Sequence, residues 1–339
     1  MRLKDPIIER VLSAFRAVLP AATRVKLVAA HGQRVELAIA GQRVRAQWLS
    51  TGLPGDVRER AAMRPRPDVA VARALSPGAK DALSRLRIGW IDETGAAELA
   101  LKTIVVSRSG RPQPPAPRRT EQWTPALLAV AEALLCGVRP TVEATCEATE
   151  LSGGACGNAL RRLTDAGLLA ARAARGRASA RSIVDQRAFL AAYAAQAVAR
   201  PHRTPPLVVG VTWRDMVHGL RDVGRSWTHQ GIAWAATGPV AAAVMAPLLT
   251  NVGSATVYVD ASTTAELVAL AARSDLPPLD GGRLTLAPFP TTSTRLLARS
   301  AGSLRVAPWP RVYADLRVTG VRGEEAAEHL LEVVNDRGT

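Results

Sequence analysis

Alternating apolar and polar side chains predict a succession of strands and helices in the first 110 residues. On both sides of Gly41 the apolar residues occupy every second position, which indicates a β-hairpin. Ser76 followed by Pro77 is typical of a helix start, because serine caps the helix and proline suits its first turn. The expected elements are a helix over Pro6–Val18, a hairpin over Arg34–Trp48, strands at Asp68–Ala72 and Ile88–Ile91, and a helix from Ser76. This mixture predicts an α+β unit.

The middle of the chain predicts three helices followed by a hairpin. Leucines and valines recur at helical spacing before Gly137, and Thr141 and Ser152 are suitable N-caps for the two helices that follow. The expected elements are helices over Trp123–Gly137, from Thr141 and over Ala155–Ala166, then strands at Leu168–Arg172 and Ala180–Val184 around an Arg-rich tip. This order is that of a winged helix-turn-helix, which places its third helix in the major groove of DNA.

The third of these helices has two different sides. Leu151, Leu160 and Leu163 face one way and anchor it, whereas polar side chains gather on the other side. Arginine and asparagine make bidentate contacts to guanine and adenine edges, and hairpin arginines can bind phosphate or a narrow minor groove. The candidate DNA-binding residues are Ser152, Asn158, Arg161, Arg162, Arg172, Arg175, Arg177 and Arg181. The alternative interpretation is a protein-binding module with a solvated Arg-rich hairpin.

The C-terminal part predicts a mixed α/β unit. The expected elements are a strand at Leu207–Val211, helices at Asp215–His229 and Val240–Leu249, a strand at Thr256–Asp260, a helix at Ala265–Ala272 and a hairpin around Gly281, with Leu284 and Leu286 in it. Strand, Thr-Gly turn, Ala-rich helix and strand in this order resemble the opening of the nucleotidyltransferase fold. Active members hold Mg²⁺ with two carboxylates spaced Asp-x-Asp. Here Asp260 stands alone, since Tyr258 occupies the other position. Asp315 on a further strand could complete the site, and the alternative interpretation is a capped or salt-bridged structural aspartate.

The charge of the chain favours polyanionic partners. Lys and Arg number 44 against 29 Asp and Glu, and residues 1–119 alone contain 22 basic and 10 acidic residues. Proline-rich stretches at 111–117 and 200–206 read as extended connectors. They divide the chain into three expected units: residues 1–110, a basic α+β unit; residues 118–200, the winged helix-turn-helix; and residues 207–339, the α/β unit.

A cytoplasmic location is expected. The segment Met1–Arg10 carries charges where a secretory signal has an apolar core, and three cysteines cannot all pair. The uncharged run Gln230–Val259 is long enough to span a bilayer, but Pro239 and Pro247 interrupt it. No membrane association is expected.

Several segments together resemble the long bacterial proteins grouped with AbiEi-type antitoxins of type IV toxin-antitoxin systems. They are Leu75–Ala79, Gly89–Ala96, the winged-helix block, Gly231–Gly238, and Arg311–Leu316 with Arg322–His329. The resemblance implies an autorepressing DNA-binding regulator whose C-terminal domain counters a nucleotidyltransferase toxin or senses a signal. It also implies a degenerate PD-(D/E)xK nuclease-like N-terminal unit. Where such nucleases carry acid-x-Lys, this chain has Arg45-Ala-Gln47, while Asp68 and Glu98 remain.

The sequence therefore predicts a multidomain α+β transcriptional regulator that binds double-stranded DNA. Because both carboxylate pairs are incomplete, we expect no enzyme activity, catalytic residue, metal or cofactor. Two alternatives stay open. One is a Mg²⁺-dependent enzyme, either a nucleotidyltransferase using Asp260 or a nuclease using Asp68 and Glu98. The other is an antitoxin module that binds a cognate toxin protein, and a second copy of the chain is a further candidate partner.

Overall fold

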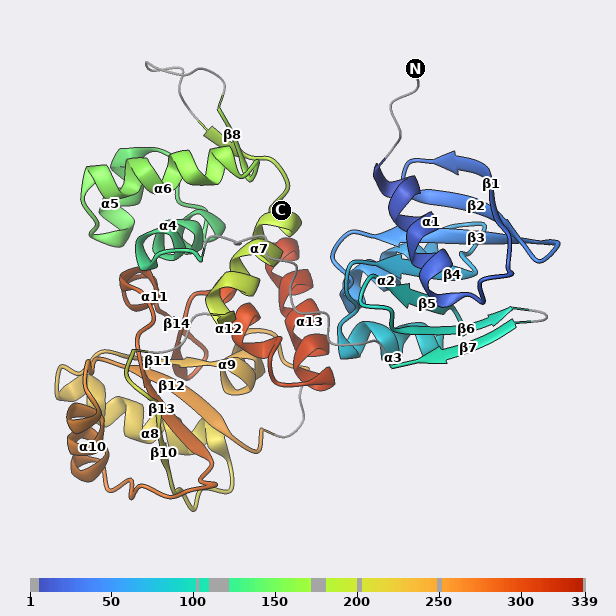
Figure 1. Cartoon of the computed structure of the whole chain (residues 1–339). Coiled ribbons are helices and arrows are strands. Elements are labelled where there is room, and N and C mark those ends of the chain that lie inside the picture. The colour runs from blue at the N-terminus through green and yellow to red at the C-terminus, as the bar shows by residue number, and fades with distance from the viewer. Residues whose placement is uncertain are drawn as a thin grey trace. The chain divides into compact units, whose positions relative to one another are not determined.

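The structure, a computed structural model, describes residues 6–101, 104–109, 122–171, 181–199, 203–248 and 252–337. The chain divides into two compact units, unit 1 (Met1–Thr120) and unit 2 (Glu121–Thr339). Both combine helices with a mixed sheet, which confirms the α+β class (Figure 1). In the described part of the chain, no helix combines the length and apolar character needed to cross a lipid bilayer.

Unit 1 is a seven-stranded sheet in which each strand lies beside the next one in the sequence. Its strands are β1 (Val25–His31), β2 (Arg34–Ile39), β3 (Gln42–Leu49), β4 (Val69–Ala72), β5 (Gly89–Asp92), β6 (Ala97–Leu101) and β7 (Ile104–Arg108). Its helices are α1 (Pro6–Val18), α2 (Pro54–Ala62) and α3 (Pro77–Arg85). Strands β3, β4 and β5 run parallel, and the other neighbours are antiparallel.

The expected hairpin over Arg34–Trp48 is confirmed as β2 and β3. Its two turn residues, Ala40 and Gly41, both have positive φ, 47° and 79°. Positive φ at both positions is the geometry of turns whose twist matches paired strands. Strand β4 is buried on both faces of the sheet: Val69 and Val71 pack in the core beneath α1, while its two alanines belong to the core under α2 and α3.

Unit 2 contains a six-stranded sheet in the order β10-β13-β12-β11-β15-β14. These strands are β10 (Leu207–Val209), β11 (Trp234–Thr237), β12 (Ala255–Val259), β13 (Leu284–Pro288), β14 (Arg299–Ala301) and β15 (Leu304–Val306). A separate pair consists of β8 (Leu169–Ala171) and β9 (Arg181–Ile183). The helices are α4 (Pro125–Leu135), α5 (Val142–Thr149), α6 (Gly153–Asp165), α7 (Gln186–Ala199), α8 (Met216–His229), α9 (Gly238–Met245), α10 (Thr264–Arg273), α11 (Thr292–Leu296), α12 (Trp309–Leu316) and α13 (Val321–Arg337).

Two expectations for this sheet were wrong. Leu284 and Leu286 lie in a single central strand, β13, rather than in a hairpin, because β13 pairs with β10 on one side and β12 on the other. Asp315 lies on helix α12 instead of a strand. Residues 309–314 of α12 are all buried, so the short segment shows no one-sided apolar pattern that would distinguish helix from strand.

Residues on both sides of the connector at 200–206 share one core. Phe189 and Tyr193 on α7 belong to the same buried cluster as Val312 and Tyr313, and α7 packs against α12. The three units expected from the sequence therefore appear as two compact units, with residues 121–339 forming one of them. The proline-rich composition indicated an extended connector. It did not reveal that α7, before the connector, packs against α12, which comes long after it.

Replacing Gly224 with alanine should destabilise unit 2 by about 1–3 kcal/mol, the usual cost of overpacking a core. A Cβ at this position of α8 would lie 2.2 Å from Trp234 Cζ2, and the buried Trp234 ring packs edge-on against Trp227 with centroids 6.1 Å apart. Urea unfolding followed by tryptophan fluorescence would measure the change, because five of the seven tryptophans lie in unit 2. Gly253→Ala is the control, since its Cβ would meet no atom within 4 Å. Equal effects from both variants would contradict this packing argument.

Candidate functional site

Helices α4, α5 and α6 and the strand pair β8–β9 occur in the predicted order. Thr141 and Ser152 cap α5 and α6, as predicted. Thr124 caps α4, which begins at Pro125, two residues after the expected start at Trp123. Helix α6 begins at Gly153, two residues before the expected Ala155. In α6, the Ser152 hydroxyl oxygen accepts a hydrogen bond from the Ala155 amide at 3.3 Å. A capped helix start places its first amides toward the surface, where they can meet an anion.

Helix α6 has a buried side and an exposed side, as predicted. Leu160 and Leu163 are fully buried, whereas Asn158 and Arg161 are exposed. The helix approaches α5 closely at two glycines, Gly153 and Gly157, where an added Cβ would lie 3.8 Å from Val142. The apolar side therefore holds α6 against the other helices while its polar side faces solvent.

The structure brings several of the predicted residues together on α6. Arg161 Nη2 donates a hydrogen bond to Asn158 Oδ1 at 2.6 Å, so the two exposed side chains form a pair. Arg162 is half-buried, and Ser152 lies exposed at the start of the helix. Asn158 and Arg161 are thus the two predicted residues that the structure joins directly, and DNA binding by this set stays a prediction.

The arginines predicted on the hairpin have two outcomes. Arg172, Arg175 and Arg177 lie outside the described residues. Arg181, at the start of β9, is half-buried and donates from Nε to Thr164 Oγ1 on α6 at 3.2 Å. Arg181 therefore ties the hairpin to α6 in addition to any contact it makes with a partner.

Helix α4 carries a buried carboxylate that the sequence interpretation did not single out. Glu132 on α4 is 0% exposed and accepts hydrogen bonds from Ser293 Oγ at 3.1 Å, Thr294 Oγ1 at 2.9 Å and the hydroxyl of Tyr193. Burial raises the pKa of Glu132 above its ordinary value, against the opposing effect of these hydrogen bonds. A signal was present in the sequence, because Glu132 is the one charged residue in α4.

The carboxylate of Asp315 is occupied by partners inside the protein. Tyr258 donates its hydroxyl to Asp315 Oδ2 at 2.8 Å, the Thr237 hydroxyl donates to the same oxygen, and Arg311 forms a two-pronged ion pair with both oxygens. Burial lowers the pKa of Arg311, but Asp315 and the neighbouring tyrosines raise it above its ordinary value overall. Asp260 is elsewhere, exposed just after the end of β12.

The two acids predicted in unit 1 also have protein partners. Asp68 pairs with Arg45 Nη2 at 2.7 Å and accepts the Arg45 backbone amide at 2.9 Å. Burial raises the pKa of Asp68, but these hydrogen bonds lower it below its ordinary value overall. Glu98 accepts from Ser84 Oγ at 3.3 Å. Across the described ranges, no three His, Cys, Asp or Glu side chains gather closely enough to hold a metal ion.

No protein-family model, curated protein or solved structure matches this chain. The resemblance to the AbiEi-type antitoxins therefore stays a prediction.

Proposed function

We propose that this chain is a sequence-specific DNA-binding transcriptional regulator, of repressor or antitoxin type, in which residues 122–199 act as a winged helix-turn-helix. The observation that carries the proposal is the two-sided helix α6, with Asn158 and Arg161 exposed opposite the buried Leu160 and Leu163. A recognition helix needs both features, because its apolar side must be anchored while its polar side reaches base edges.

Charge supports the same proposal. Three arginines, Arg172, Arg175 and Arg177, stand in the sequence between β8 and β9, where a winged helix contacts the DNA backbone. Residues 1–119 add an excess of 12 basic side chains. Arginine contacts to phosphate release counterions, so DNA affinity should fall steeply as the salt concentration rises.

Under this proposal the flanking parts are a nuclease-like N-terminal unit and a nucleotidyltransferase-like C-terminal part, both serving regulation. The partners of their carboxylates are in keeping with it: Arg45 neutralises Asp68, and Arg311 neutralises Asp315. A cognate toxin protein and a second copy of the chain remain candidate partners, and we place the protein in the cytoplasm.

The proposal is tested by measuring binding of the full chain to its own upstream DNA and to a scrambled duplex. Fluorescence anisotropy at about 50 and 200 mM salt separates the phosphate contribution from base recognition, since only the former falls steeply in this range. We expect a preference for the upstream sequence that survives the higher salt. Absence of salt-sensitive binding to either duplex would overturn the proposal.

Replacing Arg161 with alanine should reduce the preference for the upstream duplex about tenfold, because a bidentate contact to a base contributes about 1–3 kcal/mol of discrimination. Affinity for the scrambled duplex should change much less. Arg273→Ala is the matched control, since Arg273 is an exposed arginine at the end of α10, far from α6 within unit 2 (Figure 1). If Arg161→Ala kept the full preference for the upstream duplex, Arg161 would have no role in base recognition.

Arg175→Ala provides the contrast within the same assay. It should weaken binding to both duplexes equally and reduce the slope of log affinity against log salt by about one. Identical effects of the Arg161 and Arg175 variants would contradict the separate roles given to the helix and the hairpin.

A further inference from the structure

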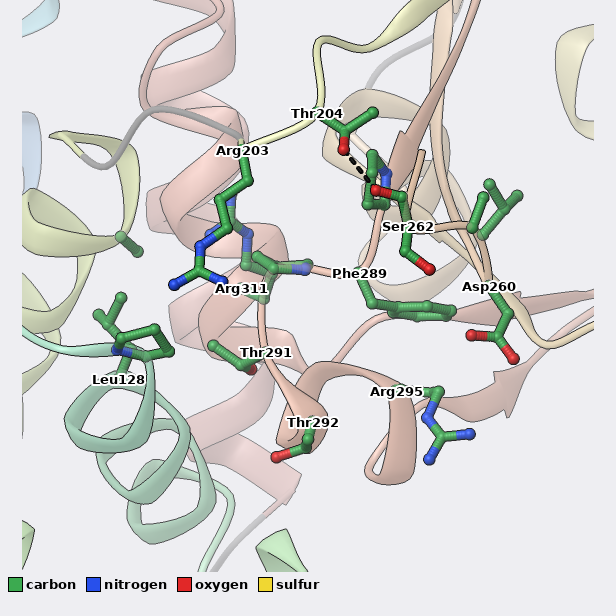
Figure 2. A pocket seen from close by; sticks show the side chains of 16 residues that line it. Leu128, Arg203, Thr204, Asp260, Ser262, Phe289, Thr291, Thr292, Arg295 and Arg311 are labelled. Atoms are coloured by element: carbon green, nitrogen blue, oxygen red, sulfur yellow. Dashed lines mark hydrogen bonds between the residues drawn. The ribbon is translucent and has the colours of Figure 1, made fainter. Parts of the chain in front are cut away.

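A cavity of about 440 Å³ lies within unit 2 where strands β12 and β13 end (Figure 2). Helices α4 and α7 form one wall, with Pro125 and Leu128 on α4 and Ala197 on α7. The segments that follow β12 and β13 form the other wall. The carboxyl ends of neighbouring parallel strands commonly form ligand sites, and the volume lies in the range of small-molecule pockets. The cavity is therefore large enough for a small organic molecule.

Two arginines supply positive charge on one side of this cavity. Arg203 is exposed and has no hydrogen-bond or ion-pair partner among the described residues. The buried Arg311 uses Nε and Nη2 for its hydrogen bonds to Asp315 and Tyr258 within the described chain, which leaves Nη1 for another acceptor. Asp315 holds the Arg311 guanidinium in place, so this donor is positioned before a ligand arrives.

The middle of the cavity is apolar. Phe289 follows β13 and packs against Tyr258 with ring centroids 6.0 Å apart, so the Tyr258 ring helps to fix the position of the Phe289 ring. Pro288 and Pro290 flank it along the same wall. In Figure 2, Arg203 and Arg311 lie on one side of Phe289, and Asp260 and Arg295 lie on the other.

We propose that this cavity binds a small organic anion, with its oxyanion group held by Arg203 and Arg311 and its flat, partly apolar body lying against Phe289. Carboxylate and phosphate each present a pair of oxygens that a guanidinium fork can bind with two parallel hydrogen bonds. On the opposite side of Phe289, Arg295 is paired with Glu150 at 3.7 Å, so the carboxylate of Asp260 makes that end less favourable for a negative group and orients the ligand.

One wall of the cavity is bonded directly to the helices of the proposed DNA-binding module. Thr292, in the cavity wall, donates its hydroxyl to the Thr149 carbonyl at the end of α5 at 2.8 Å. Arg295 pairs with Glu150 at 3.7 Å, at the turn that leads to α6. Ser293 and Thr294, which lie between Thr292 and Arg295 in the chain, donate to Glu132 on α4. A ligand that reorders this segment therefore acts on α4 and on the turn before α6.

The ligand accordingly regulates DNA binding, a consequence that rests on the proposed function, whereas binding itself does not. Titration calorimetry of the full chain tests binding. The probes are phenyl phosphate, benzoate and inorganic phosphate at roughly millimolar concentrations, and their comparison distinguishes an organic phosphate or carboxylate from free phosphate as the ligand. We expect phenyl phosphate or benzoate to bind more tightly than inorganic phosphate, because only the former two carry an apolar body. No heat from either aromatic anion, or tighter binding of inorganic phosphate, would overturn the proposal.

Variants locate the ligand. Arg203→Ala should weaken the better aromatic anion about tenfold, Arg203→Lys should weaken it less, and Arg273→Ala should leave it unchanged. Asp260→Asn should strengthen the same ligand several-fold by removing the like charge. Both Arg203 and Asp260 are exposed, so these variants keep the core intact. Affinity that is insensitive to Arg203→Ala would place the ligand elsewhere and overturn the site.

The regulatory consequence has its own readout. The affinity for DNA, measured by fluorescence anisotropy in the presence of the better ligand, should change at least several-fold. This change should disappear in Arg203→Ala. Unchanged DNA affinity with confirmed ligand binding would overturn the regulatory coupling alone. Absence of DNA binding under all conditions would overturn the proposed function, while the calorimetric result would still decide the anion site.

Discussion

Replacing Asp315 with alanine should lower the free energy of unfolding of unit 2 by about 3–5 kcal/mol, the range found when one partner of a buried ion pair is removed. Arg311 is 6% exposed and would keep its charge without a counterion. The hydroxyls of Thr237 and Tyr258 would also lose their shared acceptor. Urea unfolding monitored by tryptophan fluorescence measures the loss.

Two controls make this result specific. Asp280→Ala removes an exposed aspartate that has no interaction in the described chain, and its effect should stay within about 0.5 kcal/mol. The double variant Arg311→Met with Asp315→Leu should recover much of the loss, since apolar pairs of similar volume often replace buried ion pairs without cost. A loss of under about 1 kcal/mol for Asp315→Ala would mean that the pair behaves like an exposed one.

Replacing Glu132 with alanine should cost several kcal/mol, because it leaves a cavity and removes the acceptor shared by three buried hydroxyls, each unsatisfied group costing about 1–3 kcal/mol. The acceptor is shared by Tyr193 on α7 and by Ser293 and Thr294 on α11, so the loss should loosen the attachment of α4 to the rest of unit 2. Glu132→Gln preserves shape and an acceptor oxygen and should be much milder. Equal losses in the two variants would contradict the expectation that a single acceptor oxygen largely satisfies these hydroxyls.

The pH dependence of Glu132 has a definite sign. Since burial raises its pKa in the folded protein, the folded state holds a proton that the unfolded state releases above about pH 4.5. The stability from this proton is fully present below that pH and is lost as pH rises through the raised folded pKa. The unfolding free energy of the wild type minus that of Glu132→Gln should therefore fall as the pH rises, by at most about 1.4 kcal/mol per pH unit. A difference that increases with pH over this window would contradict the raised pKa.

The local elements of the chain could be predicted from its sequence. The caps Thr141 and Ser152, the hairpin turn at Gly41 and the apolar side of α6 are all confirmed, because capping, turn geometry and helical spacing depend on residues within a few positions of each other. The exposed and buried sides of α6 follow from the same helical spacing. DNA binding by the exposed side stays a prediction.

Long-range relationships could not be predicted in this way. The partners Glu132 and Thr294 are 162 positions apart, and the partners Thr237 and Asp315 are 78 positions apart. Asp315 was expected on a strand because a short apolar run is compatible with either element. Likewise, only the folded chain shows that Arg203, Phe289 and Arg311 surround one cavity.

The α+β class, the succession of three helices and a hairpin, and the excess of positive charge follow from the sequence alone, since these depend on composition and on neighbouring residues. The tertiary structure decided which carboxylates are neutralised, which residues on either side of the proline-rich connector share a core, and where a ligand has room. These outcomes depend on burial and on contacts between distant segments, and burial sets both the pKa of an acid and the strength of its ion pairs.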